Sequence, residues 1–267
     1  MPAPKVLVIG TGEYVTGLVH GSESTSDKGA GIVALTLFDL RERGLVSAII
    51  LAGSNGSKFP LVRSHFNQLI AERYEMDTSF RSFPDDDQKD SNAWKNALQE
   101  LNPGDAVIIF TPDDLHYEMA YTAASKGLNV LVTKPIVKTI EEHDSLIEIS
   151  REKKSTIAME VHKRWDPIYS DAREKIRDLG EFSYFSSYMS QPKSQLDSFR
   201  DWAGKSSDIS YYLNAHHIDF HCWALGGLAR PISVIASAST GVATSQGLPT
   251  EDSITLMVDW LNNSGTK

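Results

Sequence analysis

The stretch Lys5-Val-Leu-Val-Ile-Gly-Thr-Gly12 decides the fold of this 267-residue chain. Lys5–Ile9 is an apolar run that ends at Gly10, which is typical of a strand buried on both faces. Gly10 and Gly12 then predict a tight turn into a helix, where backbone N–H groups can meet a phosphate. The sequence therefore predicts the first strand and turn of a parallel α/β sheet.

Three further apolar runs repeat this strand pattern: Ala48–Ala52, Ala106–Phe110 and Asn129–Val132. Helical patterns lie between and after them. In Asn92–Leu101, the apolar side chains recur at i, i+3, i+4 and i+7. A second helix follows Pro112-Asp113 and stops at Gly127, and a third is capped by Thr139 and runs to Arg151. Strands alternating with helices predict βαβ units with right-handed crossovers.

The pattern changes beyond residue 160. Ile232–Ala238 and Ile254–Trp260 alternate with period two, which indicates antiparallel strands with one covered and one open face. We predict a doubly wound Rossmann domain at 1–160 and an α+β domain with an open, mostly antiparallel sheet at 161–267. Asn262–Gly265 is a hairpin-turn signal followed by only two residues, so we expect the chain to be C-terminally incomplete.

Composition excludes several classes of protein. The formal net charge of -9 argues against a nucleic-acid partner, because such proteins carry a basic patch. No apolar run approaches the roughly 20 residues of a membrane span, and no secretory signal opens the chain. The single cysteine, Cys222, rules out an internal disulfide framework; we expect it to be packed in the core. We therefore predict a cytoplasmic protein without membrane partners.

The glycine turn predicts a dinucleotide site. Its members are Gly10, Thr11, Gly12, Glu13 and Tyr14. The third glycine of the usual fingerprint is replaced by valine, so the competing interpretation is a tight turn without a ligand.

The second strand points to the identity of the dinucleotide. NAD sites place an acidic residue near this strand to bind the ribose 2′-hydroxyl, but none occurs between Gly44 and Ala71. Ser54, Asn55 and Lys58 offer hydroxyl, amide and ammonium groups instead, which suit a 2′-phosphate. We predict NADP(H) as the favoured cofactor and NAD(H) as the second; the alternative is an ordinary turn with a surface lysine.

Several motifs in order resemble the Gfo/Idh/MocA oxidoreductases. They are Gly10-Thr-Gly12, Thr111-Pro-Asp-Asp-Leu-His116, Val130-Leu-Val-Thr-Lys-Pro135, Val161-His-Lys-Arg-Trp-Asp-Pro167, His216-His-Ile-Asp219 and Leu225-Gly226. The resemblance covers nearly the whole chain and is greatest to fungal-type D-galacturonate reductases. It implies a Rossmann domain, a C-terminal sheet used for homo-oligomerisation, and hydride transfer to or from a carbon of a sugar or sugar acid.

The resemblance also assigns residues. It implies cofactor contacts at Thr111, Pro112, His116 and Lys134, with Lys134 and His216 as catalytic residues. The chain departs from the family at two acidic positions. Thr133 stands before Lys134, and Tyr212 stands four residues before His216 and becomes a candidate catalytic substitute.

Helical spacing supports a polar face around His216. If Tyr211–Leu225 is helical, Tyr212, His216 and Asp219 share one stripe. His216 then orients the substrate or assists proton transfer, held by Asp219; alternatively it is a structural histidine satisfied by that aspartate.

Two further pairs of residues are candidates for ligand sites. Lys163 and Arg164 follow a strand, so they are candidates to bind a substrate carboxylate, with surface charge or a cofactor phosphate contact as alternatives. Asp219 and His216 complete the predicted substrate contacts. His217 and His221 have the spacing of a helical zinc pair but lack an obvious third ligand, so we predict no metal.

Three functions remain open. The leading one is NADPH-dependent reduction of a sugar or uronate, most specifically D-galacturonate at its aldehyde carbon. The second is a non-catalytic nucleotide-sensing regulator of the same fold, since the acid at 212 is lost. The third is an NAD-dependent glycosidase.

Overall fold

The computed structural model describes residues 2–193, 195–200 and 202–267. The chain divides into two compact units, one comprising residues 1–111 and 115–159 and the other residues 112–114 and 160–267. Each unit is described by itself below.

The first unit is built on a six-stranded sheet in the order β5-β4-β1-β6-β7-β8. The strands are β1 (Lys5–Ile9), β4 (Ala48–Ala52), β5 (Arg81–Phe83), β6 (Ala106–Ile109), β7 (Asn129–Thr133) and β8 (Ile157–Glu160). The pairs β1–β4, β1–β6, β4–β5 and β6–β7 are parallel. This is the doubly wound order of a Rossmann sheet, so the predicted fold of this unit is confirmed.

Alternating side chains of the central strands enter two separate cores. On β1, Leu7 and Ile9 belong to one core, whereas Val6 and Val8 belong to the other. Because both faces of the strand are buried, its sequence is apolar without alternation.

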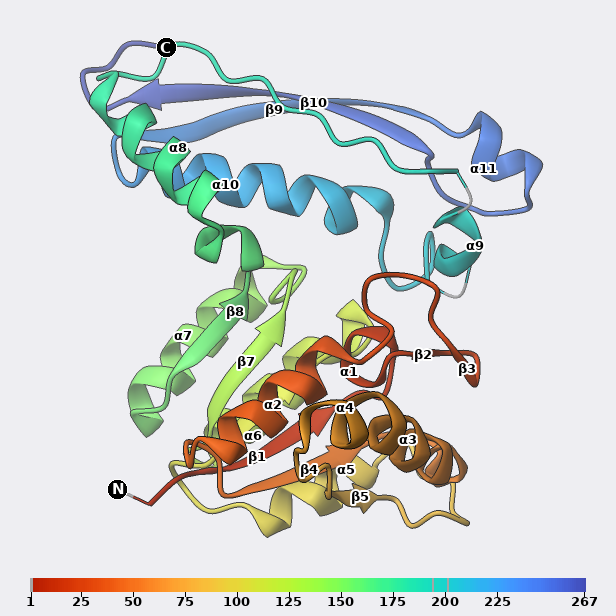
Figure 1. The fold of residues 1–267 in the computed structure, drawn as a ribbon. Helices are drawn as coiled ribbons and strands as arrows, with labels where there is room; N and C mark the ends of the chain where they lie inside the picture. Colours follow the sequence, from red (N-terminus) through yellow and green to blue (C-terminus); the bar gives the residue numbers. More distant parts are fainter. Residues whose placement is uncertain (1, 194, 201) are drawn as a thin grey trace. The chain divides into compact units, whose positions relative to one another are not determined.

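Helices cover both faces of this sheet (Figure 1). They are α1 (Glu13–Thr16), α2 (Ile32–Glu42), α3 (Phe59–Phe66), α4 (Glu72–Tyr74), α5 (Ala93–Ala97), α6 (His116–Ser125) and α7 (Ile140–Lys153). Short 3-10 or π segments adjoin them: η1 (Gly56–Lys58), η2 (Asn67–Ala71), η3 (Leu98–Glu100) and η4 (Asp113–Leu115). The predicted cap is present, since Thr139 Oγ1 accepts a hydrogen bond from the amide of Glu142 at 3.2 Å.

The helix after the first glycine turn is interrupted. It ends at Thr16, and the chain makes an excursion through the hairpin β2 (Leu18–Val19) and β3 (Ser22–Glu23) before α2 begins. Gly17 and Gly31 close the excursion in left-handed conformations, with φ of 76° and 77°. The periodic pattern did not reveal this insertion, because serine, glycine and charged residues carry no periodicity.

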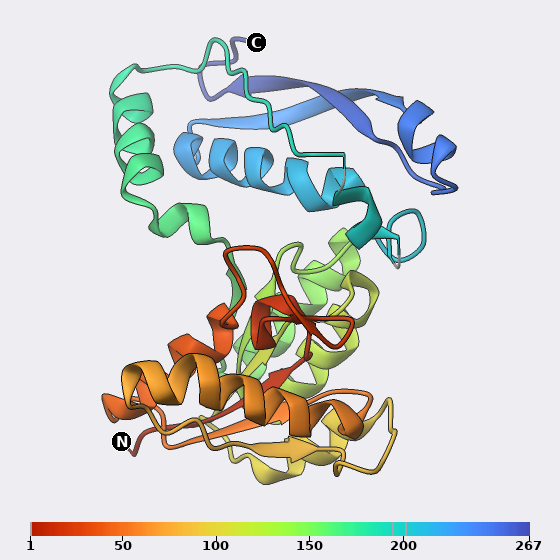
Figure 2. The ribbon, with the colours of Figure 1, turned by 45° about the vertical axis from the view of Figure 1, so that its right-hand side comes forward.

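The second unit contains helices and an antiparallel ribbon. Its elements are η5 (His162–Trp165), α8 (Pro167–Asp178), α9 (Gln195–Phe199), η6 (Ser210–Asn214), α10 (Ala215–Leu225), β9 (Ala229–Ser239), α11 (Gly241–Ser245) and β10 (Ser253–Asn262). Strands β9 and β10 pair antiparallel, as predicted, and α10 runs alongside them in both views (Figures 1 and 2).

The ribbon exposes large apolar side chains: Ile232, Val234, Ile235 and Met257. Val234 and Ile235 are adjacent in β9, so large apolar side chains are exposed on both faces of the ribbon and not on the predicted open face alone. The predicted use of the sheet for oligomerisation stays a prediction. Among the described residues, the helices are too short or too polar to traverse a lipid bilayer.

Candidate functional site

The glycine turn lies at the edge where the strand order reverses. Gly10 follows β1, and its amide donates to the carbonyl of Ala52 at the end of β4 at 2.8 Å. A Cβ at Gly10 would lie 2.0 Å from the carbonyl oxygen of Phe110, which follows β6. Its φ of 117° is also a conformation that other residues avoid. Only glycine therefore lets β1 turn so close to β6.

Gly12 differs from Gly10 because it borders open space. A Cβ at Gly12 would meet no heavy atom within 4 Å, and its φ of -81° suits any residue. Among the described residues, no acceptor takes the amides of Gly12 and Glu13, whereas the Gly12 carbonyl accepts from Val15 and Thr16. Open space beside unused amides at a sheet switch point fits a dinucleotide pyrophosphate.

Glu13 and Tyr14 are held by neighbours within the same unit. Glu13 Oε1 accepts from the hydroxyls of Ser24 and Ser26 in the excursion. The Tyr14 ring stacks on Phe110, with 6.1 Å between the ring centroids. Lys28 Nζ lies 5.2 Å from the centroid of the Tyr14 ring. The carboxylate of Glu13 is thus restrained by the excursion, which also brings a cation to Tyr14.

The residues predicted to bind a 2′-phosphate lie on the loop after β4. The Asn55 side chain caps η1 by accepting from the amide and hydroxyl of Ser57. Ser54 and Lys58 are exposed. The loop therefore presents a hydroxyl and an ammonium group to solvent, while the amide oxygen of Asn55 is used locally.

An acidic loop packs against this segment. The amide of Gly56 donates to the carbonyl of Gln88, and that of Asp90 donates to the carbonyl of Ser54. A Cβ at Gly56 would lie only 1.8 Å from the carbonyl oxygen of Asp85. By its composition alone the run Asp85-Asp-Asp-Gln-Lys-Asp90 is typical of a solvated loop, but its place after β5 favours this contact, since parallel neighbours end at the same edge. Its carboxylates become candidates for a ribose hydroxyl.

Lys134 and His116 belong to adjacent turns at the carboxyl edge. Lys134 is half-buried and follows β7, which pairs with β6. His116 is fully buried, with Nδ1 2.8 Å from the carbonyl oxygen of Pro135 and Nε2 2.9 Å from that of Thr111. The His116 ring thus spans the turns that carry Thr111 and Lys134.

In the second unit, His216 lies on α10 and is 8% exposed. The ring of His162, in η5, packs edge-on against it at 5.1 Å between centroids, and His162 Nδ1 lies 3.4 Å from Glu160 Oε1. Sequence reasoning missed His162, although it precedes the predicted pair Lys163 and Arg164. A second imidazole, which itself lies beside a carboxylate, therefore adjoins His216.

The predicted pairing of Asp219 with His216 is wrong. Asp219 accepts from Arg164 through both oxygens, with Nε to Oδ2 at 2.9 Å and Nη2 to Oδ1 at 2.6 Å. The planar guanidinium matches the carboxylate better than one imidazole nitrogen does. These hydrogen bonds raise the pKa of Arg164. The fork that was predicted to bind a substrate carboxylate is thus occupied by Asp219.

Lys163 and Tyr212 also have partners inside the unit. Lys163 Nζ donates to the hydroxyl of Tyr169 at 2.8 Å. The Tyr212 ring packs against Phe199 and Trp202, at 4.8 and 5.5 Å between centroids. Tyr212 lies in the π-helical segment η6, which alters its spacing to His216 from that of a regular α-helix.

The predicted burial of Cys222 is also wrong, since its residue is exposed. Helix α10 buries His216, His221, Ala224 and Leu225, so its buried stripe passes beside Cys222. His221 lies among the rings of Phe182, Phe185 and Trp260. Burial lowers the pKa of His221 and of His217.

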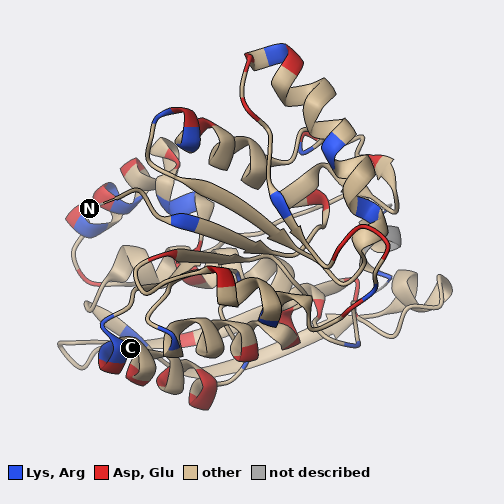
Figure 3. Cartoon of the chain, turned by 90° about the horizontal axis from the view of Figure 1, so that it is seen from below, with Lys and Arg blue, Asp and Glu red and all other residues tan. Residues whose placement is uncertain are grey.

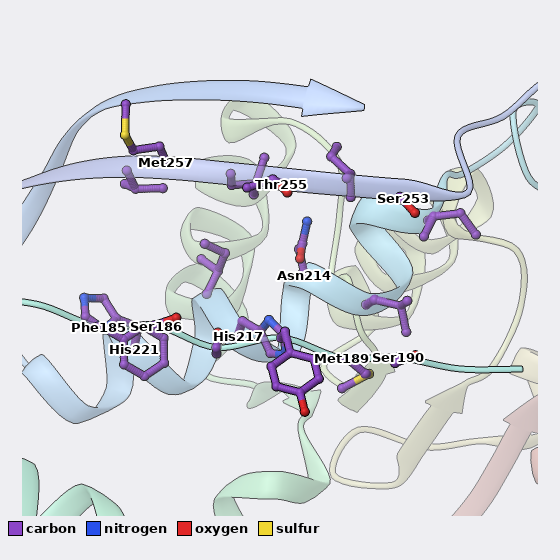
Figure 4. Close-up of a pocket in the computed structure, with 18 of the residues that line it drawn as sticks. Phe185, Ser186, Met189, Ser190, Asn214, His217, His221, Ser253, Thr255 and Met257 are labelled. Atoms are coloured by element: carbon purple, nitrogen blue, oxygen red, sulfur yellow. The ribbon is translucent and has the colours of Figure 1, made fainter. Parts of the chain in front are cut away.

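A cavity of about 900 Å³ lies in the second unit, between the segment 182–193, helix α9, the η6–α10 helix and β10. Figure 4 shows His217 and His221 among serine, threonine, methionine and phenylalanine side chains. The predicted catalytic His216 and Tyr212 do not line it. Among the described residues, no three His, Cys, Asp or Glu side chains are grouped to hold a metal ion.

Acidic and basic residues are interspersed along the elements (Figure 3). Several basic residues are paired with acids, such as Arg63 with Asp86 and Lys175 with Asp171. The charge around the candidate site therefore depends on individual residues and their ion-pair partners.

Comparison with known proteins identifies a family that this chain matches. Residues 5–161 match the Gfo/Idh/MocA family, described as an oxidoreductase family with an NAD-binding Rossmann fold. The match covers more than half of the 267 residues.

Individual relatives match over shorter shares. The chain is 30% identical over 133 residues to scyllo-inositol 2-dehydrogenase (NAD(+)) of Bacillus subtilis (strain 168), which is 49% of this chain and 39% of that protein. It is 26% identical over 116 residues to scyllo-inositol 2-dehydrogenase (NADP(+)) IolW of the same organism, which is 42% of this chain and 32% of that protein.

The fold has solved counterparts. The structure of scyllo-inositol dehydrogenase from Lactobacillus casei, with bound NAD(H) and scyllo-inositol, superposes with a TM-score of 0.69 at 14% identity. The superposition covers 99% of this chain and 67% of that one. The matches to the two Bacillus subtilis proteins span 39% and 32% of the length of those relatives. These relatives are inositol dehydrogenases, so similarity to D-galacturonate reductases stays a prediction.

Proposed function

This chain belongs to the Gfo/Idh/MocA family of oxidoreductases, and on that premise we propose that it transfers a hydride between a nicotinamide dinucleotide and a CH–OH carbon of a sugar-like substrate. The observation that carries the proposal is the Gly10-Thr-Gly12 turn. It lies at the switch point of the sheet, with open space and unused amides at Gly12. An absorbance assay of nicotinamide oxidation and reduction across inositols, aldoses and uronates tests the activity directly.

The roles of the chain's own groups follow from the chemistry. The bound nicotinamide would supply or accept the hydride. The amides of Gly12 and Glu13 would bind the pyrophosphate. In the reductive direction negative charge develops on the substrate oxygen, so a proton donor is needed beside it. We assign that role to Lys134, with His216 orienting the substrate and Tyr212 as a further candidate.

We propose NADP(H) as the favoured cofactor, supported by Lys58 and Ser54 after β4. A charge-assisted hydrogen bond is worth about 1.5–3 kcal/mol, so NADP(H) is expected to bind roughly ten- to a hundredfold more tightly than NAD(H). Lys58→Met should remove most of this preference by weakening NADP(H) alone. Fluorescence titration of both dinucleotides measures it.

Lys126→Met is the matched control, because Lys126 is exposed, caps the far end of α6 and contacts Gln99. It should leave both affinities unchanged. Equal or tighter binding of NADH by the wild type contradicts the preference, and then the loop at Asp85–Asp90 becomes the candidate ribose contact.

For the substrate, we propose D-galacturonate reduced at its aldehyde carbon as the specific activity. Two cationic groups that follow β8 support this substrate. They are the ammonium group of Lys163 and the guanidinium nitrogen of Arg164 that does not bind Asp219. Oxidation of a cyclic polyol is the second candidate, favoured by the names of the relatives and by the Arg164–Asp219 pair, which leaves less cation for a carboxylate.

Galacturonate and galactose differ only at C6, so their kcat/KM values separate these candidates. Carboxylate recognition predicts a ratio of roughly 10 to 100, lost in Lys163→Met, because a cation left without its partner disfavours the neutral sugar. A ratio near one, together with oxidation of an inositol, assigns the site to neutral polyols. Tight dinucleotide binding with no turnover on any substrate would support the regulator.

A further inference from the structure

We propose that His116 is a positioning residue for Lys134, acting by tying the turn after β7 to the turn after β6. This inference rests on the proposed function, because it treats Lys134 as the proton donor. It differs from the direct cofactor contact that the family resemblance implies for His116.

The geometry places one ring between two backbone carbonyls. His116 Nδ1 lies 2.8 Å from the carbonyl oxygen of Pro135, and Nε2 lies 2.9 Å from that of Thr111. Pro135 is bonded directly to Lys134, and Thr111 follows β6 by two residues. Since β6 and β7 are hydrogen-bonded neighbours, the ring joins the ends of two adjacent strands.

Burial makes this link strong. The side chain is 0% exposed, so water cannot replace either hydrogen bond. A neutral ring donates to one of the two oxygens, and a doubly protonated ring donates to both. Because the ring is buried, a ring nitrogen that moved away from its carbonyl would find no water to pair with, and this penalty favours the arrangement that keeps both turns against the ring.

Burial also argues against direct contact with a ligand. Both ring nitrogens already face the chain, and no part of the side chain reaches the surface. The ring can therefore influence the reaction through the position of the Lys134–Pro135 turn. Hydride transfer slows when the proton donor is misplaced by about 1 Å. A shift of the Lys134–Pro135 turn should therefore lower kcat and leave the pyrophosphate contacts at Gly12 unchanged.

The first experiment is His116→Gly with added imidazole. We expect kcat to fall at least tenfold, while the dissociation constant of the dinucleotide and the KM for substrate stay within about twofold. Imidazole should restore kcat by filling the space, whereas 1-methylimidazole should not, because its neutral ring has no N–H to donate.

His65→Gly is the matched control. His65 is another buried histidine, with Nε2 2.7 Å from the carbonyl oxygen of Gly29, but it lies on α3. It creates a cavity of the same size without touching the Lys134–Pro135 turn. Its kcat should change by less than twofold and should not respond to imidazole.

A second readout does not need turnover. The lysines are reductively methylated with ¹³C, and the Lys134 signal is assigned by its loss in Lys134→Arg. The Lys134 signal should shift in His116→Gly, return with imidazole, and stay unchanged in His65→Gly.

The outcomes are distinct. If the Lys134 signal shifts in His116→Gly but the wild type turns over no substrate, the proposed function is overturned and the positioning role stands. An unmoved signal and an unchanged kcat in His116→Gly overturn the positioning role alone. A large loss of dinucleotide affinity in His116→Gly overturns it in favour of direct cofactor contact.

Discussion

Lys134→Met is expected to lower kcat by about 10²–10⁴ while leaving dinucleotide affinity nearly intact. Methionine keeps the length and apolar stem of the side chain but removes the N–H donors, and a positioned proton donor typically contributes this factor. Lys134 is half-buried at the end of β7, on the carboxyl edge of the sheet where such folds bind ligands. Steady-state kinetics with the best substrate, together with fluorescence titration of the dinucleotide, measures the split.

Two further variants sharpen the result. Lys134→Arg keeps the positive charge and should retain more activity than Lys134→Met if charge on the substrate oxygen is what the residue stabilises. Lys153→Met removes an exposed lysine that pairs with Glu152 and should behave as wild type. Normal turnover of Lys134→Met would return this lysine to a structural role and favour the regulator.

Alanine at Gly10 and at Gly12 should have opposite consequences. Gly10→Ala forces a methyl group to within 2.0 Å of the Phe110 carbonyl oxygen in a conformation with φ of 117°. Backbone strain and overpacking each cost about 1–3 kcal/mol, so the free energy of unfolding should fall by roughly 2–6 kcal/mol. The midpoint of urea unfolding, followed through the buried Trp94 in this unit, measures it.

Gly12→Ala is the paired variant. Its methyl group meets no atom within 4 Å at an ordinary φ of -81°, so stability should change by less than about 0.5 kcal/mol. Dinucleotide affinity should fall at least tenfold, because the methyl group occupies the space through which the pyrophosphate approaches the backbone. Unchanged affinity in Gly12→Ala would place the dinucleotide elsewhere.

The fold of the first unit was predictable because its signals are local. Apolar runs at Lys5–Ile9 and Ala48–Ala52 predict doubly buried strands, and the structure buries Leu7 and Val8 in opposite cores. The Thr139 cap is equally local, since its hydrogen bond joins residues three apart. Period-two alternation likewise predicted β9 and β10, because the pleat of a strand fixes which side chains share a face.

What the sequence by itself determined is therefore the α/β order, the glycine turn and the motifs that place the chain in its family. Only the tertiary structure decided which side chains meet. It paired Asp219 with Arg164, 55 residues away, instead of with His216 on the same helix. It also packed the Asp85–Asp90 loop against Gly56 and buried His116 between two carbonyls. Periodicity specifies the face of an element, but partners distant in sequence depend on how those faces come together, and that is set by packing and hydrogen-bond geometry.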